Sequence, residues 1–252
     1  MNHRFFGTLT KFGTIIENMT FEDSHRFPNL DDSSITQNTR CAYPLSYIDN
    51  ISPNSCADLP KNIIMLTCDA FGVLPPISEL SIAETIFYFL SGFTSKVAGT
   101  EGGVVSPSPT FSSCFGAPFL PLHPHVYGKL LKARLLDSGC KCWLVNTGWI
   151  GGGYTVGKRI DIPTTRKIIS AITSNLLKNI SKEIDPSFGL KVPFEVPGVE
   201  KRLLSPRSLW EKEDLYDNEA KKVRQMFIEN FKQFKSFVDK DVNNVVEKLK
   251  SF

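Results

Sequence analysis

Two short apolar runs without polar interruption constrain the fold of this chain more than any other feature. The first covers residues 63–67, between Pro60 and Gly72, and the second covers residues 142–145. Continuous apolar runs of this length are typical of strands that helices bury on both faces. Because helical segments follow each run, the sequence predicts an α/β fold of the mixed α+β kind, whose sheet has further strands.

A capping box marks the start of the first predicted helix. Ser81 is the expected N-cap, and Glu84 is the residue that reaches back to it. The helix should run to about Ala98 and stop at Gly99, because glycine readily adopts the conformation that ends helices. The stretch that follows, residues 99–118, is rich in Gly, Pro, Ser and Thr. Loops of this length inside a compact domain are usually functional.

Three more helices are expected further along the chain, whereas the first 55 residues are turn-rich and should form hairpins and loops. One helix begins at Pro124 and stops at Gly139. The next is capped by Thr164 or Thr165. The last occupies about residues 211–250 and has a solvated basic face. Its apolar stripe consists of Ala220, Val223, Phe227, Phe231, Phe234 and Val238.

Composition excludes several classes of protein. Of the 252 residues, 41% are apolar, which is enough to build a core and excludes a disordered chain. The 29 Lys and Arg residues exceed the 26 Asp and Glu residues by only three, so no nucleic-acid partner is expected. The sequence contains no run of 18 apolar residues, so no membrane span is expected either.

The six cysteines and four histidines are not spaced like the ligands of a zinc site, since only Cys140 and Cys142 form a close cysteine pair. His123 and His125 flank Pro124, and a helix start explains them better than a metal does. A chain of this size does not need disulfides, so reduced thiols and a cytoplasmic location are expected.

Two groups of residues have chemistry that a site could use. Asp69 follows the first apolar run, where α/β proteins often place functional groups. A turn in which its carboxylate accepts backbone amides explains it equally well. Residues 112–114 (Ser-Ser-Cys) are candidate nucleophiles only if a base lies near them, and no motif supplies one.

A glycine-rich loop at residues 148–157 precedes Lys158 and Arg159. Backbone amides and a guanidinium together suit an anion. The loop is not a GxxxxGK[ST] phosphate loop, because Arg159 stands where that motif has Ser or Thr. Arg40 lies in a polar run and, taken alone, reads as a surface arginine.

A series of strings in a fixed order carries a specific resemblance to an enzyme family. The strings are Lys11-Phe12-Gly13-Thr14, Ile16-Glu17-Asn18, Asn38-Thr39-Arg40-Cys41-Ala42-Tyr43-Pro44, Leu66-Thr67-Cys68-Asp69-Ala70-Phe71-Gly72-Val73-Leu74-Pro75-Pro76, Ser91-Gly92-Phe93-Thr94, Ala98-Gly99-Thr100-Glu101, Thr110-Phe111-Ser112-Ser113-Cys114-Phe115-Gly116, Leu144-Val145-Asn146-Thr147-Gly148-Trp149 and Gly157-Lys158-Arg159-Ile160. From about Lys11 to about Asn230, the chain resembles the C-terminal half of ATP-dependent phosphoenolpyruvate carboxykinases.

The resemblance implies a carboxy-lyase that converts oxaloacetate and ATP to phosphoenolpyruvate, carbon dioxide and ADP in gluconeogenesis. It also implies Mg²⁺ and usually a second cation such as Mn²⁺. Decarboxylation to an enolate and phosphoryl transfer both gather negative charge, so cations and arginines are the expected catalytic tools. The implied fold is the C-terminal part of the family's mononucleotide-binding domain, an incomplete sheet surrounded by helices.

The resemblance also implies roles for single residues. Arg40 matches the family's arginine that contacts the transferring phosphoryl group and the substrate, which makes it the expected catalytic residue and an ATP ligand. Arg159 and Ile160 match residues around the adenine and ribose of ATP. Thr165 matches a threonine near the adenine.

Residues 99–116 resemble the family's mobile lid. The expected lid residues are Gly99, Thr100, Glu101, Gly102 and Gly103. Residues 1–10 do not look like the family. Residues 11–252 are then expected to form a partial C-terminal nucleotide-binding domain.

The resemblance places the family's phosphate loop, metal ligands and oxaloacetate-binding arginine upstream of Lys11. We therefore expect the metals to be bound by the missing N-terminal half, itself an implied partner, and the isolated chain to be inactive. The alternative is a degenerate half-protein that binds a nucleotide or a partner without catalysis. In-frame DNA upstream of Met1 that encodes a phosphate loop and metal ligands would favour the enzyme, and a stop codon without them would favour the alternative.

Overall fold

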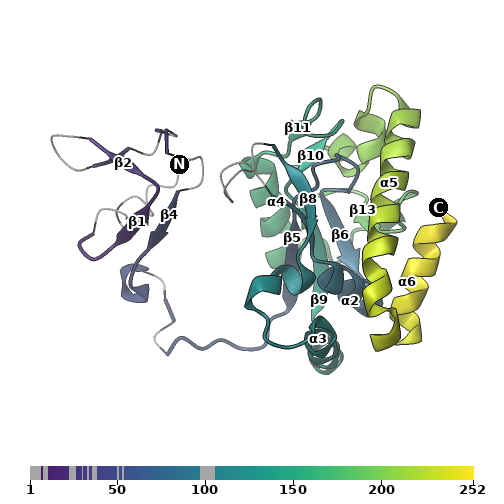
Figure 1. Cartoon of the computed structure of the whole chain (residues 1–252), viewed down its shortest axis with the longest axis horizontal. Coiled ribbons are helices and arrows are strands. Elements are labelled where there is room, and N and C mark those ends of the chain that lie inside the picture. The colour runs from purple at the N-terminus through teal and green to yellow at the C-terminus, as the bar shows by residue number, and fades with distance from the viewer. Residues whose placement is uncertain are drawn as a thin grey trace. The chain divides into compact units, whose positions relative to one another are not determined.

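The computed structural model describes residue 7 and residues 11–22, 27–29, 31–32, 34–35, 39–49, 51–52, 54–96 and 106–252. The chain divides into two compact units. The first comprises residues 1–58 with 96–107, and the second comprises residues 59–95 with 108–252. Figure 1 labels the elements of both units.

The first unit contains short antiparallel pairs, as its turn-rich sequence predicts. Strand β1 (Ile15–Glu17) pairs with β4 (Arg40–Ala42), and β2 (Thr20–Phe21) pairs with β3 (Pro28–Asn29). A short 3₁₀ helix, η1 (Leu45–Tyr47), follows β4.

A five-stranded sheet forms the centre of the second unit. Its strands in spatial order are β12 (Lys182–Ile184), β13 (Lys191–Pro193), β6 (Ile77–Leu80), β9 (Lys141–Asn146) and β5 (Asn62–Thr67). Strands β5 and β9 are the two apolar runs of the sequence, and they pair in parallel. The other pairings are antiparallel. The mixed α/β class and the further strands predicted from the sequence are confirmed.

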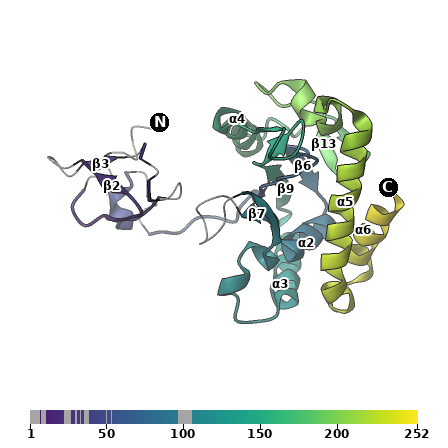
Figure 2. The ribbon, with the colours of Figure 1, turned by 45° about the horizontal axis from the view of Figure 1, so that its top comes forward.

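Helices cover both faces of this sheet, and β9 shows how the sequence produces the layers. Cys142 and Leu144 belong to the cluster formed with α2 (Ile82–Ser91), α5 (Glu213–Phe231) and α6 (Lys240–Ser251). Trp143 and Val145 belong to the cluster formed with α4 (Ile162–Thr173) on the other face. Successive side chains of a strand point to opposite faces, so a strand between two helical layers is apolar throughout. Figure 2 shows α4 on the side of the sheet away from α2 and α5.

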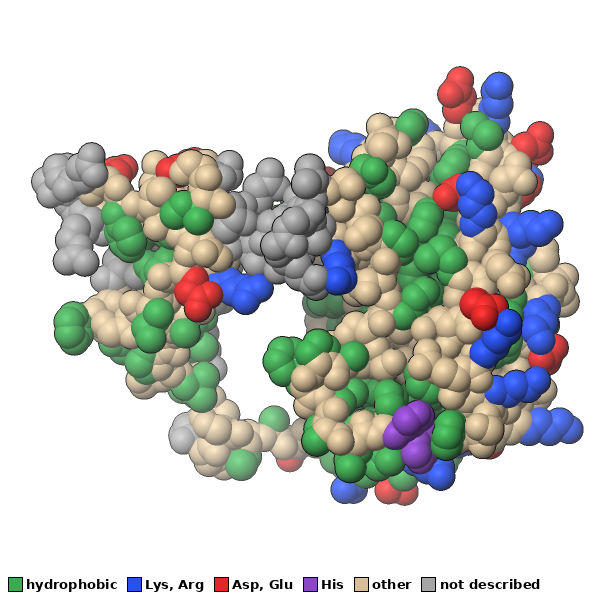
Figure 3. Space-filling model, viewed as in Figure 1, with side chains coloured by type: hydrophobic (Ala, Val, Ile, Leu, Met, Phe, Trp, Pro, Cys, Tyr) green, Lys and Arg blue, Asp and Glu red, His purple; other side chains and the backbone are tan. Residues whose placement is uncertain are grey.

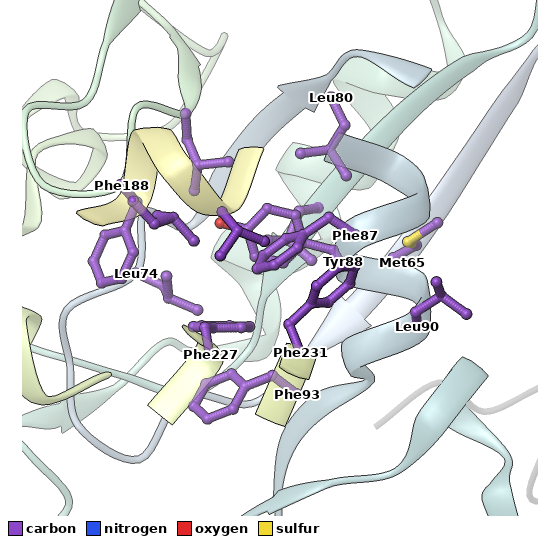
Figure 4. Close-up of a cluster of buried hydrophobic side chains, with 14 of the residues drawn as sticks. Met65, Leu74, Leu80, Phe87, Tyr88, Leu90, Phe93, Phe188, Phe227 and Phe231 are labelled. Atoms are coloured by element: carbon purple, nitrogen blue, oxygen red, sulfur yellow. The ribbon is translucent and has the colours of Figure 1, made fainter. Parts of the chain in front are cut away.

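Aromatic side chains fill the larger of the two clusters. Phe87 and Tyr88 from α2 meet Phe227 and Phe231 from α5, with ring centroids 4.8–5.7 Å apart. Phe93 packs on Phe227 at 4.9 Å. Figure 4 shows these rings between α2 and the C-terminal helices. The first four residues of the predicted apolar stripe, Ala220 to Phe231, are therefore the surface that α5 buries, and Phe234 continues it in the segment that follows. Figure 3 shows lysine and arginine side chains over the outer side of the same region.

The first helix ends earlier than the sequence suggested. The capping box of Ser81 and Glu84 is present, but α2 stops at Gly92, which adopts φ 56°, and not at Gly99. A Cβ on Gly92 would lie 1.7 Å from the carbonyl oxygen of Ser112, so this close backbone approach requires glycine. The chain then continues as β7 (Phe93–Lys96), which pairs with β8 (Ser108–Phe111).

Two further predicted boundaries are revised and one is confirmed. Helix α3 (Pro124–Ser138) has the predicted limits. The N-cap of α4 is Asp161 and not Thr164 or Thr165. Its side chain accepts a hydrogen bond from the amide of Thr164. The last predicted helix is interrupted: α5 is followed by η6 (Lys232–Phe237), and α6 restarts behind its own N-cap, Asp239. The remaining elements are η2 (Ser113–Phe115), η3 (Ala117–Phe119), β10 (Trp149–Ile150), β11 (Lys158–Arg159), η4 (Lys201–Leu204) and η5 (Pro206–Leu209).

A buried carboxyl group closes the turn between β12 and β13. Asp185 accepts the amides of Ser187 and Phe188 at 3.2 and 2.6 Å. Arg224 of α5 donates to the carbonyl oxygen of Ser187 at 3.0 Å. Burial raises the pKa of Asp185 to about 6, although the two amides and the Arg224 charge act in the opposite direction.

This raised pKa predicts a pH-dependent stability. The folded chain keeps a proton on Asp185 at pH values where the unfolded chain has lost it, so the free energy of unfolding should fall as the pH rises from about 4 to about 6. Asp185→Asn keeps an oxygen for both amides but does not titrate. Urea titrations give the free energy of unfolding at about pH 4 and at about pH 7. Between these two pH values it should fall by about 1–3 kcal/mol more in the unaltered chain than in this variant. Asp137→Asn, an exposed change on α3, is the control, and equal losses in the unaltered chain and Asp185→Asn would contradict the prediction.

Candidate functional site

The carboxyl ends of β5 and β9 meet at a loop that Asp69 organises. One oxygen of Asp69 accepts the amide of Phe71 at 2.8 Å, and the other accepts those of Val73 and Leu74 at 2.7 and 2.8 Å. Its side chain is fully buried. Burial raises the pKa of Asp69, and the amides that it accepts counteract this shift. The turn interpretation of Asp69 is therefore confirmed, because both of its oxygens accept backbone amides.

Asn146 joins the two strand ends, a role that the sequence analysis missed. Its side-chain oxygen accepts the amides of Asp69 and Gly148 at 3.0 and 2.8 Å, and its nitrogen donates to the carbonyl oxygen of Leu74 at 3.0 Å. The signal available in the sequence was a polar residue directly after the apolar run 142–145. A buried amide needs such partners, so its position between two loops is its structural role.

The C-terminal segment completes the loop at residues 69–74. Trp210 donates its indole N–H to the carbonyl oxygen of Gly72 at 3.0 Å, and Tyr216 donates its hydroxyl to that of Val73 at 3.0 Å. Both acceptors are thereby paired with groups far along the chain.

The glycine-rich loop packs backbone against backbone on the same region. A Cβ on Gly148 would lie 2.2 Å from the carbonyl oxygen of Asp69, and one on Gly72 would lie 2.0 Å from that of Gly152. Tyr154 donates its amide to the carbonyl oxygen of Ala70 at 2.9 Å. These approaches explain why glycines recur here, and they fix the start of the β10–β11 hairpin.

A pocket of about 740 Å³ lies beside this hairpin, at the first turns of α4. It is lined by Thr147, Arg159, Ile160, Asp161, Ile162, Thr165, Arg166, Ile169, Ser170 and Thr173. The structure thus brings together Arg159, Ile160 and Thr165, three of the four residues expected to bind ATP. Arg166 was not singled out from the sequence, although it lies one residue after Thr165.

Arg159 enters the pocket from β11 with its guanidinium held in place. Its Nε donates to the carbonyl oxygen of Thr147 at 3.1 Å, and Nη2 lies 3.9 Å from the sulfur of Cys68. The guanidinium also lies over the ring of Trp149, 5.3 Å from its centroid. Burial raises the pKa of the Cys68 thiol, and the Arg159 charge counteracts that shift.

Thr165 and its neighbours form the polar part of the pocket. The Thr165 hydroxyl donates to the carbonyl oxygen of Asp161 at 3.1 Å, which leaves its own oxygen able to accept a hydrogen bond. Hydrogen bonds from Thr164 lower the pKa of Asp161, so the N-cap is a carboxylate at neutral pH. With isoleucines on the wall and two guanidiniums at the lining, the pocket suits a ligand with an apolar face and negative charge.

Arg40 and the lid residues belong to other parts of the chain. Arg40 lies on β4 of the first unit, is exposed, and stands opposite Glu17 in the strand register. The lid residues Gly99, Thr100, Glu101, Gly102 and Gly103 lie outside the described residues. The described end of the predicted lid forms β8 and η2, in which Cys114 and Phe115 both adopt positive φ, 57° and 56°.

The other candidates have structural explanations. His123 caps α3, and its Nδ1 lies 2.7 Å from Nδ1 of His125, whose ring stacks on Phe237. Across the described ranges, no group of three or more His, Cys, Asp or Glu side chains is arranged to hold a metal ion. No helix in the described part of the chain is long and apolar enough to cross a membrane. All six cysteines are free thiols.

Comparison with known proteins identifies the chain's relatives. Residues 2–202 match the family model described as phosphoenolpyruvate carboxykinase, so the match includes most of residues 1–10, which looked unlike the family. Proteins named phosphoenolpyruvate carboxykinase (ATP) are 53% identical over 237 residues in Cereibacter sphaeroides, 52% over 240 in Ruegeria pomeroyi and 51% over 245 in Brucella suis. These alignments cover 94%, 95% and 97% of this chain but only 44%, 45% and 46% of the relatives. The chain therefore spans less than half the length of the relatives that it matches.

Proposed function

Because this chain belongs to the phosphoenolpyruvate carboxykinase family, we propose that it forms part of an enzyme that converts oxaloacetate and ATP to phosphoenolpyruvate, carbon dioxide and ADP. The observation that carries this proposal is the pocket at the start of α4, where Arg159, Ile160 and Thr165 converge. By resemblance these residues correspond to the family's nucleotide-contacting positions. One is a cation, one is apolar and one carries a hydroxyl, so each suits a different part of one nucleoside. We place the reaction in gluconeogenesis and in the cytoplasm.

Each pocket residue has a distinct proposed role. Ile160 is 7% exposed and offers an apolar surface to the adenine. Thr165 presents a hydroxyl oxygen that accepts a hydrogen bond, which suits an amino group on the base. Arg159 presents a planar cation that stacks on a base or donates to the ribose.

In this proposal Arg40 and the lid act on the reacting groups. Decarboxylation leaves an enolate, and the transferring phosphoryl group spreads charge over its oxygens, so a bidentate guanidinium at Arg40 stabilises the transition state. Residues 99–116 would close over the substrates and exclude water, which otherwise protonates the enolate to pyruvate.

The divalent metals of this chemistry do not fit the described residues, which contain no suitable cluster of ligands. In the proposal Mg²⁺ and Mn²⁺ neutralise phosphate charge and are bound by the portion of the relatives that this chain does not span. We therefore expect no carboxykinase activity from the chain alone. Turnover above a heat-killed control would contradict this expectation.

Arg159→Ala should weaken ATP binding to the purified chain by about tenfold or more, because a charged donor in the pocket is lost. Isothermal titration calorimetry with ATP measures the dissociation constant. Arg134→Ala, an exposed arginine on α3, is the matched control and should bind like the unaltered chain. Unchanged affinity in Arg159→Ala would contradict the proposed function, and a lowered melting temperature would reveal a folding defect instead.

Arg40→Ala, in a protein that also carries the remaining length of the family, should lower turnover about 100-fold or more and change ATP affinity far less. The guanidinium is proposed to act mainly on the transition state. Arg40→Lys should recover little, because an ammonium does not reproduce the bidentate contact. Steady-state kinetics with oxaloacetate and ATP measure both variants, and a normal turnover number in Arg40→Ala would exclude this role.

A further inference from the structure

We propose that Trp149 is a positioning residue of the nucleotide pocket, because its indole ring holds the guanidinium of Arg159 in the orientation that meets the ligand. The inference rests on the proposed function, since it concerns the same pocket. It assigns a role to a tryptophan that does not itself line the pocket.

The strand register brings the two side chains together. Trp149 and Arg159 are direct partners in the antiparallel pair β10–β11. Directly opposed residues project to the same face of a two-stranded sheet and interact there. The Arg159 guanidinium carbon lies 5.3 Å from the Trp149 ring centroid, within the range of a cation–π interaction, for which tryptophan is the strongest partner.

Two further contacts direct the same guanidinium. Nε is used by the carbonyl oxygen of Thr147, and Nη2 lies against the sulfur of Cys68. Within the described residues Nη1 makes no hydrogen bond, so it remains available to a ligand. The ring of Trp149 therefore lies against a guanidinium that keeps a free donor for the ligand.

The contact with Trp149 reduces the conformational entropy that Arg159 loses when a ligand binds. A free arginine side chain loses considerable rotamer freedom when a ligand immobilises it, whereas a pre-oriented one loses little. The hairpin that carries both residues is itself fixed by the close glycine contacts to residues 69–72. Trp149 thus acts on the ligand through Arg159.

A double-mutant cycle on the purified chain, titrated with ATP, tests the inference. Trp149→Leu should weaken ATP affinity by about three- to tenfold, the range that a cation–π contact supports. Trp149→Phe should weaken it less, because a smaller aromatic ring remains. In the Arg159→Ala background, Trp149→Leu should have no further effect, whereas a merely structural role would lower affinity in that background too. Melting temperatures of all variants identify any that do not fold, and Trp149→Phe covers the case in which Trp149→Leu fails to fold.

The outcomes separate this inference from the proposed function. Weaker binding in Arg159→Ala together with normal binding in Trp149→Leu would overturn the positioning role and leave the pocket's function standing. Equal losses from Trp149→Leu with and without Arg159 would also overturn it. Absence of ATP binding in the unaltered chain would overturn both.

Discussion

The site depends on the hydrogen bonds that the side-chain amide of Asn146 makes. This amide ties the loop after β5 to the loop after β9, because its oxygen accepts the amides of Asp69 and Gly148 and its nitrogen reaches the carbonyl oxygen of Leu74. Parallel strands deliver their carboxyl ends to one edge of a sheet but do not fix the loops that leave it. A buried group left without its partner costs about 1–3 kcal/mol, so this side chain acts with the close glycine contacts to fix where the glycine-rich loop and the hairpin begin.

From that anchor the pocket is assembled by backbone contact and only then by side chains. Glycines at 72 and 148 allow the two loops to touch, and the β10–β11 hairpin then projects Arg159 toward the first turns of α4. Helix α4 follows the hairpin directly, with Asp161 as its N-cap, so Ile160 and Thr165 line the same pocket. The cation, the apolar side chain and the hydroxyl of the pocket therefore come from one short stretch of chain, residues 159–165.

Much of this could be predicted from the sequence, and the failures have physical reasons. Strands β5 and β9 and helix α3 were predictable because apolar runs and Pro and Gly end signals are local. The end of α2 was not, because the stop at Gly92 depends on its contact with Ser112, which follows β8 about twenty residues later. The five-strand order was also not predictable, since β6, β12 and β13 are too short to show a pattern. For the site, resemblance supplied Arg159, Ile160 and Thr165, but neither Trp149 nor Asn146, because a strand register and a buried amide appear only in three dimensions.

The hydrogen bonds from Trp210 and Tyr216 bear on when, during synthesis of the chain, the loop at residues 69–74 can be completed. The donors to the carbonyl groups of Gly72 and Val73 lie 138 and 143 residues further along the chain. A chain that ends before Trp210 lacks both donors, so the hydrogen bonds that close the loop at residues 69–74 are not yet formed. The loop that the glycine-rich segment contacts is therefore closed by residues that are translated after the whole of α4. A nascent chain that stops after α4 contains every residue that lines the pocket but lacks the donors that close the loop at residues 69–74.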